Sequence, residues 1–377
     1  MNPLPLFPDS NQPATISKPA LVGIARLASS GESLREGHQV EYFTLPTKSI
    51  LNRCVSNRQM PFTWTINPYR GCEFGCRYCY ARYTHEFMEL HDAADFEQKI
   101  FIKDNAVHLL EQELRRLPEG QGIAIGTATD PYQPIERREE LTRKILEVFT
   151  RFRGHRIGIV TKSVLILRDT ELLQQVAERH TLTLNLTITT DDIALARKLE
   201  PRAPRPDLRF SAVRRLREAG LRVGVLCSPA MPGINDSQPQ LDRMAYLAAA
   251  AQASFFCSHA LFLKPCSRQV FETFVMQTFP HLLKDLQRRF ANGAFQSNEY
   301  QQALEARVKS ACRRHGLDLR YEEERMPRAA DQAADSAPAT VLRPRIVPRP
   351  AVQRQRAFAG FVPVSAVAAA AAERRTA

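Results

Sequence analysis

The sequence lacks the features that would place this chain in a membrane or outside the cell. No stretch reaches the roughly 18 consecutive apolar residues that a membrane-spanning helix needs. The first nine residues have neither the basic start nor the continuous apolar core of a signal peptide, so none is expected. Eight cysteines in 377 residues are too sparse for a disulfide framework. We therefore expect a cytoplasmic protein with no membrane partner, in a reducing compartment.

Two further absences narrow the function. No G-x-G-x-x-G motif follows a predicted strand, which removes the simplest dinucleotide-binding interpretation. Apart from one group of three, the cysteines are widely scattered and suggest no auxiliary metal cluster; they are Cys54, Cys227, Cys257, Cys266 and Cys312.

The net charge of +12 favours an acidic partner such as DNA or RNA. Part of this charge lies in one segment, because residues 327–377 contain eight Lys and Arg against three Asp and Glu, a balance of +5. The preceding 326 residues carry the remaining +7, a moderate excess for a body of that size.

Three cysteines, Cys72, Cys76 and Cys79, stand at the spacing C-x3-C-x2-C on one short loop. Thiolates are soft ligands that favour zinc or iron–sulfur clusters. A structural zinc site and an ordinary [4Fe–4S] cluster both use four protein ligands. Three cysteines on a four-iron cluster leave one iron open to a small chelating molecule. A C-C-C-H zinc site completed by His85 is the alternative.

The remaining pattern predicts an α/β protein, because strand-like and helix-like segments alternate strictly after the cysteine loop. The expected strands are 62–67, 122–127, 156–161, 182–189, 221–227 and 253–263. The expected helices are 104–116, 136–152, 169–179, 207–219, 240–252, 270–291 and 296–314. Six such units predict a parallel sheet with helices outside, either a partial (β/α)6 barrel of TIM type or an open doubly wound sheet.

Four regions are expected along the chain. Residues 1–55 are an N-terminal arm and lead-in, in which 41–51 packs under the cysteine loop. Residues 56–295 form the partial barrel, and 296–326 a helical extension. The Ala-, Pro- and Arg-rich residues 327–377 are expected to be a disordered basic tail.

The three cysteines, with Tyr78 just before the last of them, resemble the radical S-adenosylmethionine (SAM) superfamily. Residues 60–265 are similar to its catalytic domain. The segments from Thr127 to Asp130 and from Thr161 to Ser163 resemble the branch that contains spore photoproduct lyase. The resemblance implies a [4Fe–4S] cluster on Cys72, Cys76 and Cys79, with SAM on its open iron. It also implies cleavage of SAM by an electron from an external flavodoxin- or ferredoxin-like donor, giving a 5'-deoxyadenosyl radical.

The ends of the predicted strands carry the candidate SAM contacts. Thr127, Thr129 and Asp130 are polar groups that can accept from the SAM ammonium, although Asp-Pro-Tyr is also ordinary turn chemistry. The resemblance implies that Lys162 pairs with the SAM carboxylate. The alternative is that the Lys162 side chain extends into solvent. Thr187 and Thr189 alternate onto one face of their strand and suit the SAM carboxylate or ribose. Tyr78 is also assigned to the cofactor.

Four other residues receive a structural interpretation. Arg202 and Arg209 read as surface charges and His259 as a core histidine, whereas Cys257 shares the phase of His259 and can project into the barrel.

The resemblance fails at one place. The spore photoproduct lyase branch uses a cysteine near the end of the second strand to return a hydrogen atom, and no cysteine lies between Cys79 and Cys227 here. We therefore expect a lyase-like radical SAM enzyme that abstracts hydrogen from another substrate, with nucleic acid as the leading candidate. The alternative is a zinc- or cluster-bearing nucleic-acid-binding protein without catalysis.

Overall fold

A computed structural model describes residues 21–29, 33–37, 40–54 and 60–319. Residues 1–20 of the predicted arm and all of the predicted basic tail, 327–377, lie outside these residues. In the described part of the chain, no helix is both long and apolar enough to cross a bilayer.

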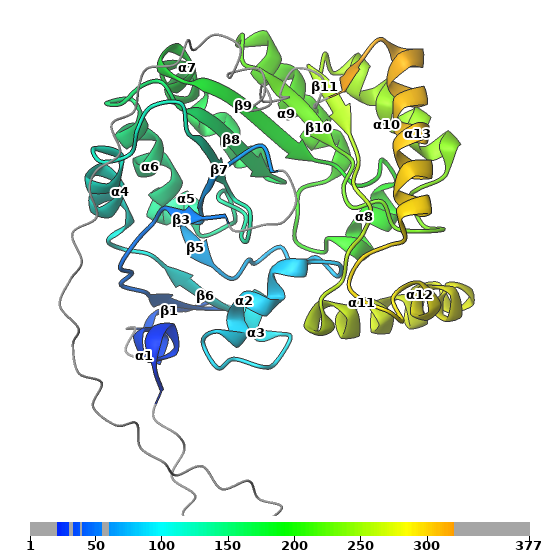
Figure 1. Ribbon diagram of the computed structural model, residues 1–377, viewed down its shortest axis with the longest axis horizontal. Helices are drawn as coiled ribbons and strands as arrows, with labels where there is room; N and C mark the ends of the chain where they lie inside the picture. Colours follow the sequence, from blue (N-terminus) through cyan, green and yellow to red (C-terminus); the bar gives the residue numbers. More distant parts are fainter. Residues whose placement is uncertain (1–20, 30–32, 38–39, 55–59, 320–377) are drawn as a thin grey trace, which may run out of the picture. The chain divides into compact units, whose positions relative to one another are not determined.

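The main sheet holds six parallel strands whose spatial order equals their order in the sequence (Figure 1). They are β4 (Trp64–Ile66), β7 (Gly122–Ile125), β8 (Arg156–Thr161), β9 (Thr181–Thr187), β10 (Val223–Leu226) and β11 (Phe255–Cys257). In a barrel, each strand lies beside the next strand in the sequence all the way round. In a doubly wound sheet, the strand order reverses at a switch point. The prediction of a partial (β/α)6 barrel is confirmed.

Two short strands that the sequence did not reveal extend the sheet at its edges. Strand β3 (Asn52–Arg53) runs antiparallel to β4, and β12 (Asp318–Leu319) runs parallel to β11. The chain thus enters and leaves the barrel through short strands at its two open edges.

Helices connect the parallel strands, and the predicted ones are present with shifted bounds. They are α4 (Ala106–Leu114), α6 (Leu141–Phe149), α7 (Thr170–Arg179), α9 (Pro206–Glu218), α10 (Gln238–Ala250), α11 (Pro265–Thr278) and α13 (Asn298–His315). Local chemistry sets several ends. Ser237 and Gln240 form a capping box at the start of α10, and Gly220 after α9 has φ +79°, a conformation that glycine adopts without strain.

Two expected helices are broken. The segment 136–152 divides into α5 (Glu136–Glu139) and α6, because Glu140 is left-handed with φ +51° and the Glu136 carboxylate accepts from the first amides of α6. The segment 270–291 divides at Pro280, which has no amide hydrogen to continue α11, into α11, a short 3₁₀ turn (Pro280–Leu282) and α12 (Leu283–Arg289). Helix α7 is likewise preceded by a 3₁₀ segment, Val164–Asp169.

A second sheet of four strands supports the cysteine loop and was only partly predicted. Its order is β1 (Ser33–Gly37), β2 (Val40–Thr44), β6 (Lys99–Ile102) and β5 (Tyr69–Arg70). Strand β5 ends directly before the loop, and the lead-in strand β2 pairs with β6. The expectation that 41–51 packs under the loop is met in this way. Four short helices complete the description: α1 (Gly23–Ser29), α2 (Tyr83–Glu86), α3 (Asp95–Gln98) and α8 (Ile193–Leu199). A 3₁₀ turn (Tyr80–Arg82) follows the third cysteine.

The inner face of the barrel is half polar and half apolar. Leu184 and Leu186 of β9 join the core shared with the helices, so Asn185 and Thr187 point the other way, into the barrel. On the neighbouring strands β10 and β11, Leu226, Phe255 and Cys257 form an apolar cluster. The Phe255 ring lies over Gly224, where an added Cβ would come within 2.0 Å of it, so this ring fills the interior near the amino ends of the strands.

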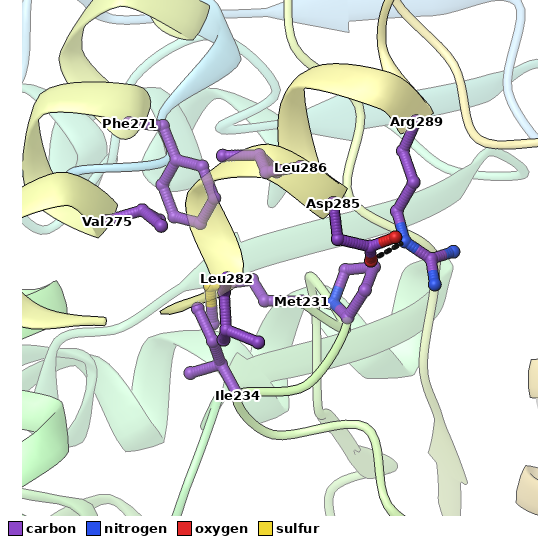
Figure 2. Close-up of a pocket in the computed structure, with 9 residues that line it drawn as sticks. Met231, Ile234, Phe271, Val275, Leu282, Asp285, Leu286 and Arg289 are labelled. Atoms are coloured by element: carbon purple, nitrogen blue, oxygen red, sulfur yellow. Dashed lines mark hydrogen bonds and ion pairs between the residues drawn. The ribbon is translucent and has the colours of Figure 1, made fainter. Parts of the chain in front are cut away.

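A second core lies on the far side of the cysteine loop, between the loop and helices α11 and α12. It joins Cys76 and Phe74 of the loop to Phe271 and Leu286 of the helices. Figure 2 shows a small pocket in this region, with Asp285 and Arg289 paired at its rim and an otherwise mainly apolar lining. Because these two charges satisfy one another, the pocket is best explained as imperfect packing around the helices.

Candidate functional site

The cysteine loop follows β5 and bends sharply at two glycines. Gly71 has φ +81°, and a Cβ there would lie 2.8 Å from the carbonyl oxygens of Phe96 and Lys99, so only glycine fits. The amide of Cys72 donates to Phe96 O at 2.9 Å, and that of Cys79 donates to Cys76 O at 3.2 Å. These bonds fold the segment into a compact turn. Cys72 and Cys76 are buried in it, and Cys79 is partly exposed.

The three thiols lie within electrostatic range of one another. Burial raises the pKa of Cys72, and Asp130, Cys76 and Cys79 raise it further. Burial also raises the pKa of Cys76, to about 12, against a lowering by Lys162. Buried thiols of this kind ionise only when a cation compensates the charge, and a coordinated metal does so outright. The donor set therefore fits a cationic, thiophilic group.

The thiols do not form a site for a single metal ion in the described part of the chain. Nowhere in the described ranges are three or more His, Cys, Asp or Glu side chains arranged around a single metal position. In an iron–sulfur cluster, each cysteine binds a different iron, so the ligands stand farther apart than around one zinc. Three neighbouring but not converging thiols fit such a cluster.

Although Nδ1 of its ring has no hydrogen-bond partner, His85 does not meet the three cysteines around one metal position within the described residues. It is 1% exposed, its Nε2 lies 2.9 Å from Lys99 O, and its ring packs against Phe96 and Phe101. Burial lowers its pKa to about 4. His85 therefore packs between the loop and the second sheet, and the alternative of a C-C-C-H zinc site is not supported.

The segment that follows β7 holds the cysteine loop through several hydrogen bonds. Thr129 Oγ1 donates to Gly71 O at 2.5 Å, and the Gln133 amide accepts from the backbone of Glu73 at 2.9 Å while donating to Gly71 O. Thr127 contributes its carbonyl, which accepts from Tyr80, and its hydroxyl, which accepts from Asn67. Two of the predicted cofactor residues, Thr127 and Thr129, thus lie directly against the loop.

Asp130 lies between β7 and β8 and is held by three donors. They are Thr161 Oγ1 at 2.6 Å, the Lys162 amide at 2.7 Å and the Tyr132 amide at 2.9 Å. Burial raises its pKa, and these hydrogen bonds oppose the rise. The bond from the Tyr132 amide forms the Asp-Pro-Tyr turn that the sequence analysis gave as the alternative role. The bond from the Lys162 amide fixes the backbone from which the Lys162 side chain projects.

Lys162 emerges at the end of β8 toward the cysteine loop. Its Nζ lies 5.7 Å from the centre of the Tyr78 ring. Burial lowers its pKa, but Cys76, Glu200 and Asp130 outweigh this and raise it. The side chain therefore provides a fixed positive charge beside the thiols.

A fully buried polar network, which sequence reasoning missed, anchors the loop to β9. The Tyr78 hydroxyl donates to Glu200, whose Oε1 also accepts from Thr189 Oγ1 at 2.8 Å. Arg209 pairs with Glu200 at 2.6 Å and donates to Thr187 O at 3.0 Å. The predicted cofactor residues Tyr78, Thr187 and Thr189 meet in this network.

Three structural interpretations from the sequence need correction or completion. Arg209 is not a surface charge, because it is 1% exposed and paired with Glu200; helix α9 turns this arginine inward. Arg202 donates to the carbonyl of Glu73 in the loop, at 3.0 Å. His259 is exposed and lies 3.1 Å from Ser228, so it is not a core residue, whereas Cys257 does face the barrel interior.

Three comparisons with known proteins agree with this geometry. The family model of the radical SAM superfamily matches residues 66–245. An uncharacterised protein of Mycobacterium tuberculosis is 31% identical over 271 residues, covering 72% of this chain and 79% of that protein. An uncharacterised protein of Methanocaldococcus jannaschii is 30% identical over 173 residues, covering 46% and 62%.

Solved structures share the fold. A mutant of spore photoproduct lyase with bound AdoMet and dinucleoside spore photoproduct superimposes with a TM-score of 0.54 at 15% identity, covering 73% of this chain and 79% of that one. Spore photoproduct lyase complexed with the dinucleoside spore photoproduct gives a TM-score of 0.53 over the same shares.

Proposed function

Because the chain belongs to the radical SAM superfamily, whose members use a [4Fe–4S] cluster and SAM, we propose that Cys72, Cys76 and Cys79 bind the cluster and that the enzyme abstracts hydrogen from nucleic acid. When bound, the cluster passes an electron to SAM, and the cleaved cofactor provides the 5'-deoxyadenosyl radical. One observation carries the proposal: three mutually interacting thiols, two of them buried, stand on one short loop, and Nε2 of the nearby His85 is bonded to Lys99 O.

In this proposal, different residues around the loop bind different groups of SAM. Lys162 offers a positive charge for the SAM carboxylate, since Cys76, Glu200 and Asp130 raise its pKa and its ammonium lies 5.7 Å from the centre of the Tyr78 ring on the cysteine loop. Thr127 and Asp130 provide oxygen atoms for the SAM ammonium, and Thr129, whose hydroxyl donates to Gly71 O, holds the loop beside them. Thr187 and Thr189, at the end of β9, suit the carboxylate or ribose. Tyr78 joins the cysteine loop to these residues through Glu200.

A nucleic-acid substrate is supported by the net charge of +12. Gly126 to Asp130, at the end of β7, includes no cysteine. We therefore do not extend the proposal to repair of thymine dimers. The proposal also includes an external flavodoxin- or ferredoxin-like reductant. It places the protein in a reducing compartment such as the cytoplasm, because the thiols must stay reduced.

Anaerobic reconstitution tests the proposal. The protein is expected to bind about four irons per chain and, with dithionite and SAM, to release 5'-deoxyadenosine. Cys72→Ser should lose both properties, whereas Cys266→Ser, a half-buried cysteine outside the motif, should keep both. Full iron loading without 5'-deoxyadenosine, or tight zinc binding that excludes iron, contradicts the proposal. Transfer of deuterium from labelled oligonucleotides into 5'-deoxyadenosine tests the substrate.

A further inference from the structure

Three aromatic rings form a row at the carboxyl edge of the barrel. Tyr80 directly follows the third cysteine, Phe262 follows β11, and Phe295 precedes α13. The ring centres of Tyr80 and Phe262 are 4.7 Å apart at an interplanar angle of 38°. Those of Phe262 and Phe295 are 5.4 Å apart at 23°, a stacked arrangement. We call these three residues the aromatic row.

The aromatic row joins the two ends of the six-strand arc. Tyr80 belongs to the loop that follows the first barrel strands, and Phe262 comes directly after the sixth strand. The inner end is fixed, because the Tyr80 hydroxyl donates to Thr127 O and Ser267 Oγ donates to Cys79 O at 2.9 Å. The outer end is fixed by a bridge between Phe262 and Phe295. The row therefore leads from the surface to the cysteine loop.

The outer end of the row is accessible, and a cation lies over a tyrosine close in sequence to the inner end. Phe295 remains 49% exposed although it stacks on Phe262, and Phe262 is half-buried. Lys264, two positions after Phe262, places its ammonium 3.3 Å from the centre of the Tyr83 ring, three positions after Tyr80. Stacked rings with an open outer end and an adjacent positive charge are the two elements with which proteins bind single-stranded nucleic acid.

We propose that the aromatic row is a stacking platform for a base of single-stranded nucleic acid, with Lys264 contacting the neighbouring phosphate. This inference rests on the proposed function and names the form in which the substrate is bound. A base stacked on the exposed ring of Phe295 extends the row, which runs from Phe295 through Phe262 to Tyr80, next to Cys79. The positive charge of the chain favours this partner over a neutral or basic peptide.

Fluorescence anisotropy with the cluster-loaded protein tests the platform. The probes are a labelled oligothymidylate of about 15 nucleotides and an abasic strand of equal length. The wild-type protein should bind the oligothymidylate about tenfold or more tightly than the abasic strand, because only the former has bases to stack. Phe295→Ala should weaken oligothymidylate binding about tenfold and leave abasic binding unchanged, whereas Phe295→Tyr should keep both.

The matched control is Tyr246→Ala. Tyr246 is 56% exposed on α10 and packs against His315, so it is an accessible ring of similar size on an outer helix. This variant should bind both strands as the wild type does. The dependence of affinity on salt should also be equal in the wild type and Phe295→Ala, since that slope reports phosphate contacts. Equal binding of the two strands by the wild type, or unchanged affinity in Phe295→Ala, overturns the inference.

The assay separates this inference from the proposed function. Release of 5'-deoxyadenosine from SAM with dithionite needs no nucleic acid. A protein that cleaves SAM but does not prefer the oligothymidylate retains the proposed chemistry and loses the platform. A protein that prefers the oligothymidylate but does not cleave SAM loses the proposed chemistry and retains a binding surface.

Discussion

Glu200 and Arg209 form a fully buried ion pair, with Oε2 and Nη2 2.6 Å apart, at the point where the cysteine loop meets the end of β9. Tyr78 and Thr189 donate to the other carboxylate oxygen, and Arg209 donates to backbone carbonyls on either side. The pair therefore fixes the residue before the third cysteine relative to the strand end on which two predicted cofactor residues lie.

Removal of the charge on Glu200 should strongly destabilise the protein. Glu200→Gln keeps the size of the side chain and its ability to accept from Tyr78, but leaves the Arg209 guanidinium buried without a counter-charge. Such changes cost about 3–5 kcal/mol in the free energy of unfolding. Urea denaturation measures the loss. The control is Asp207→Asn, since Asp207 pairs with Arg205 at the surface and should contribute little. Equal stability of the wild type and Glu200→Gln would refute the role of the pair.

Lys162→Ala should weaken SAM binding without changing iron content. The ammonium lies beside the cysteine loop, and a charge-assisted contact with the SAM carboxylate corresponds to about 10- to 100-fold in affinity. Equilibrium dialysis with labelled SAM and an iron assay on the same sample measure both quantities. Lys198→Ala, an exposed lysine on α8, is the control. Unaltered SAM affinity in Lys162→Ala rules out this role.

Gly71→Ala should displace the cysteine loop. An added Cβ would lie 2.8 Å from two backbone oxygens that belong to a different segment, and the residue has φ +81°. Reduced iron content should therefore accompany a loss of stability. Gly220→Ala separates the two effects, since Gly220 has a nearly equal φ of +79° but no atom within 4 Å of its Cβ position. That variant should show only the backbone strain, about 1–2 kcal/mol, with normal iron content. Normal iron content in both variants contradicts the steric argument.

Protonation of His85 should destabilise the fold below neutral pH. Burial lowers its pKa to about 4; the bond to Lys99 O raises it and Arg70 lowers it. Because the unfolded chain binds this proton more readily, the contribution is fully present above about pH 6.5 and is lost as the pH falls toward 4. Urea denaturation between pH 7 and 4 should show a loss of a few kcal/mol that is smaller in His85→Gln. Parallel curves for the two proteins would show that His85 does not titrate in this way.

The sequence predicts the barrel because its signal is local. Each buried strand and each amphipathic helix is visible in a short window, and strict alternation implies a parallel order. The second sheet is less visible because Glu41 of β2 pairs with Lys99 of β6, far along the chain. The break at Glu140 depends on the carboxylate of Glu136 reaching forward to cap α6, which no periodicity reveals.

The residues of the candidate site also differ in how far a local sequence pattern reveals them. The spacing of Cys72, Cys76 and Cys79 is a local motif, whereas Glu200 matters only because the fold brings it to Tyr78 from 122 positions away. Arg209 was misassigned because it stands in an arginine-rich helix where nothing local distinguishes the one side chain that turns inward. Gln133 stands in a turn whose chemistry does not require a glutamine, and in the structure its side chain accepts from the Glu73 amide and donates to Gly71 O.

The Phe255 ring that occupies the space above Gly224 has a kinetic consequence. With this ring at the amino end of the barrel, the ligands proposed above would enter and leave at the opposite end, next to the aromatic row. A polymer lying across that opening would trap the smaller molecule beneath it. The cofactor would then bind before the polymer, and the polymer would dissociate before the cofactor. Dissociation of the polymer would therefore limit how fast spent cofactor is replaced.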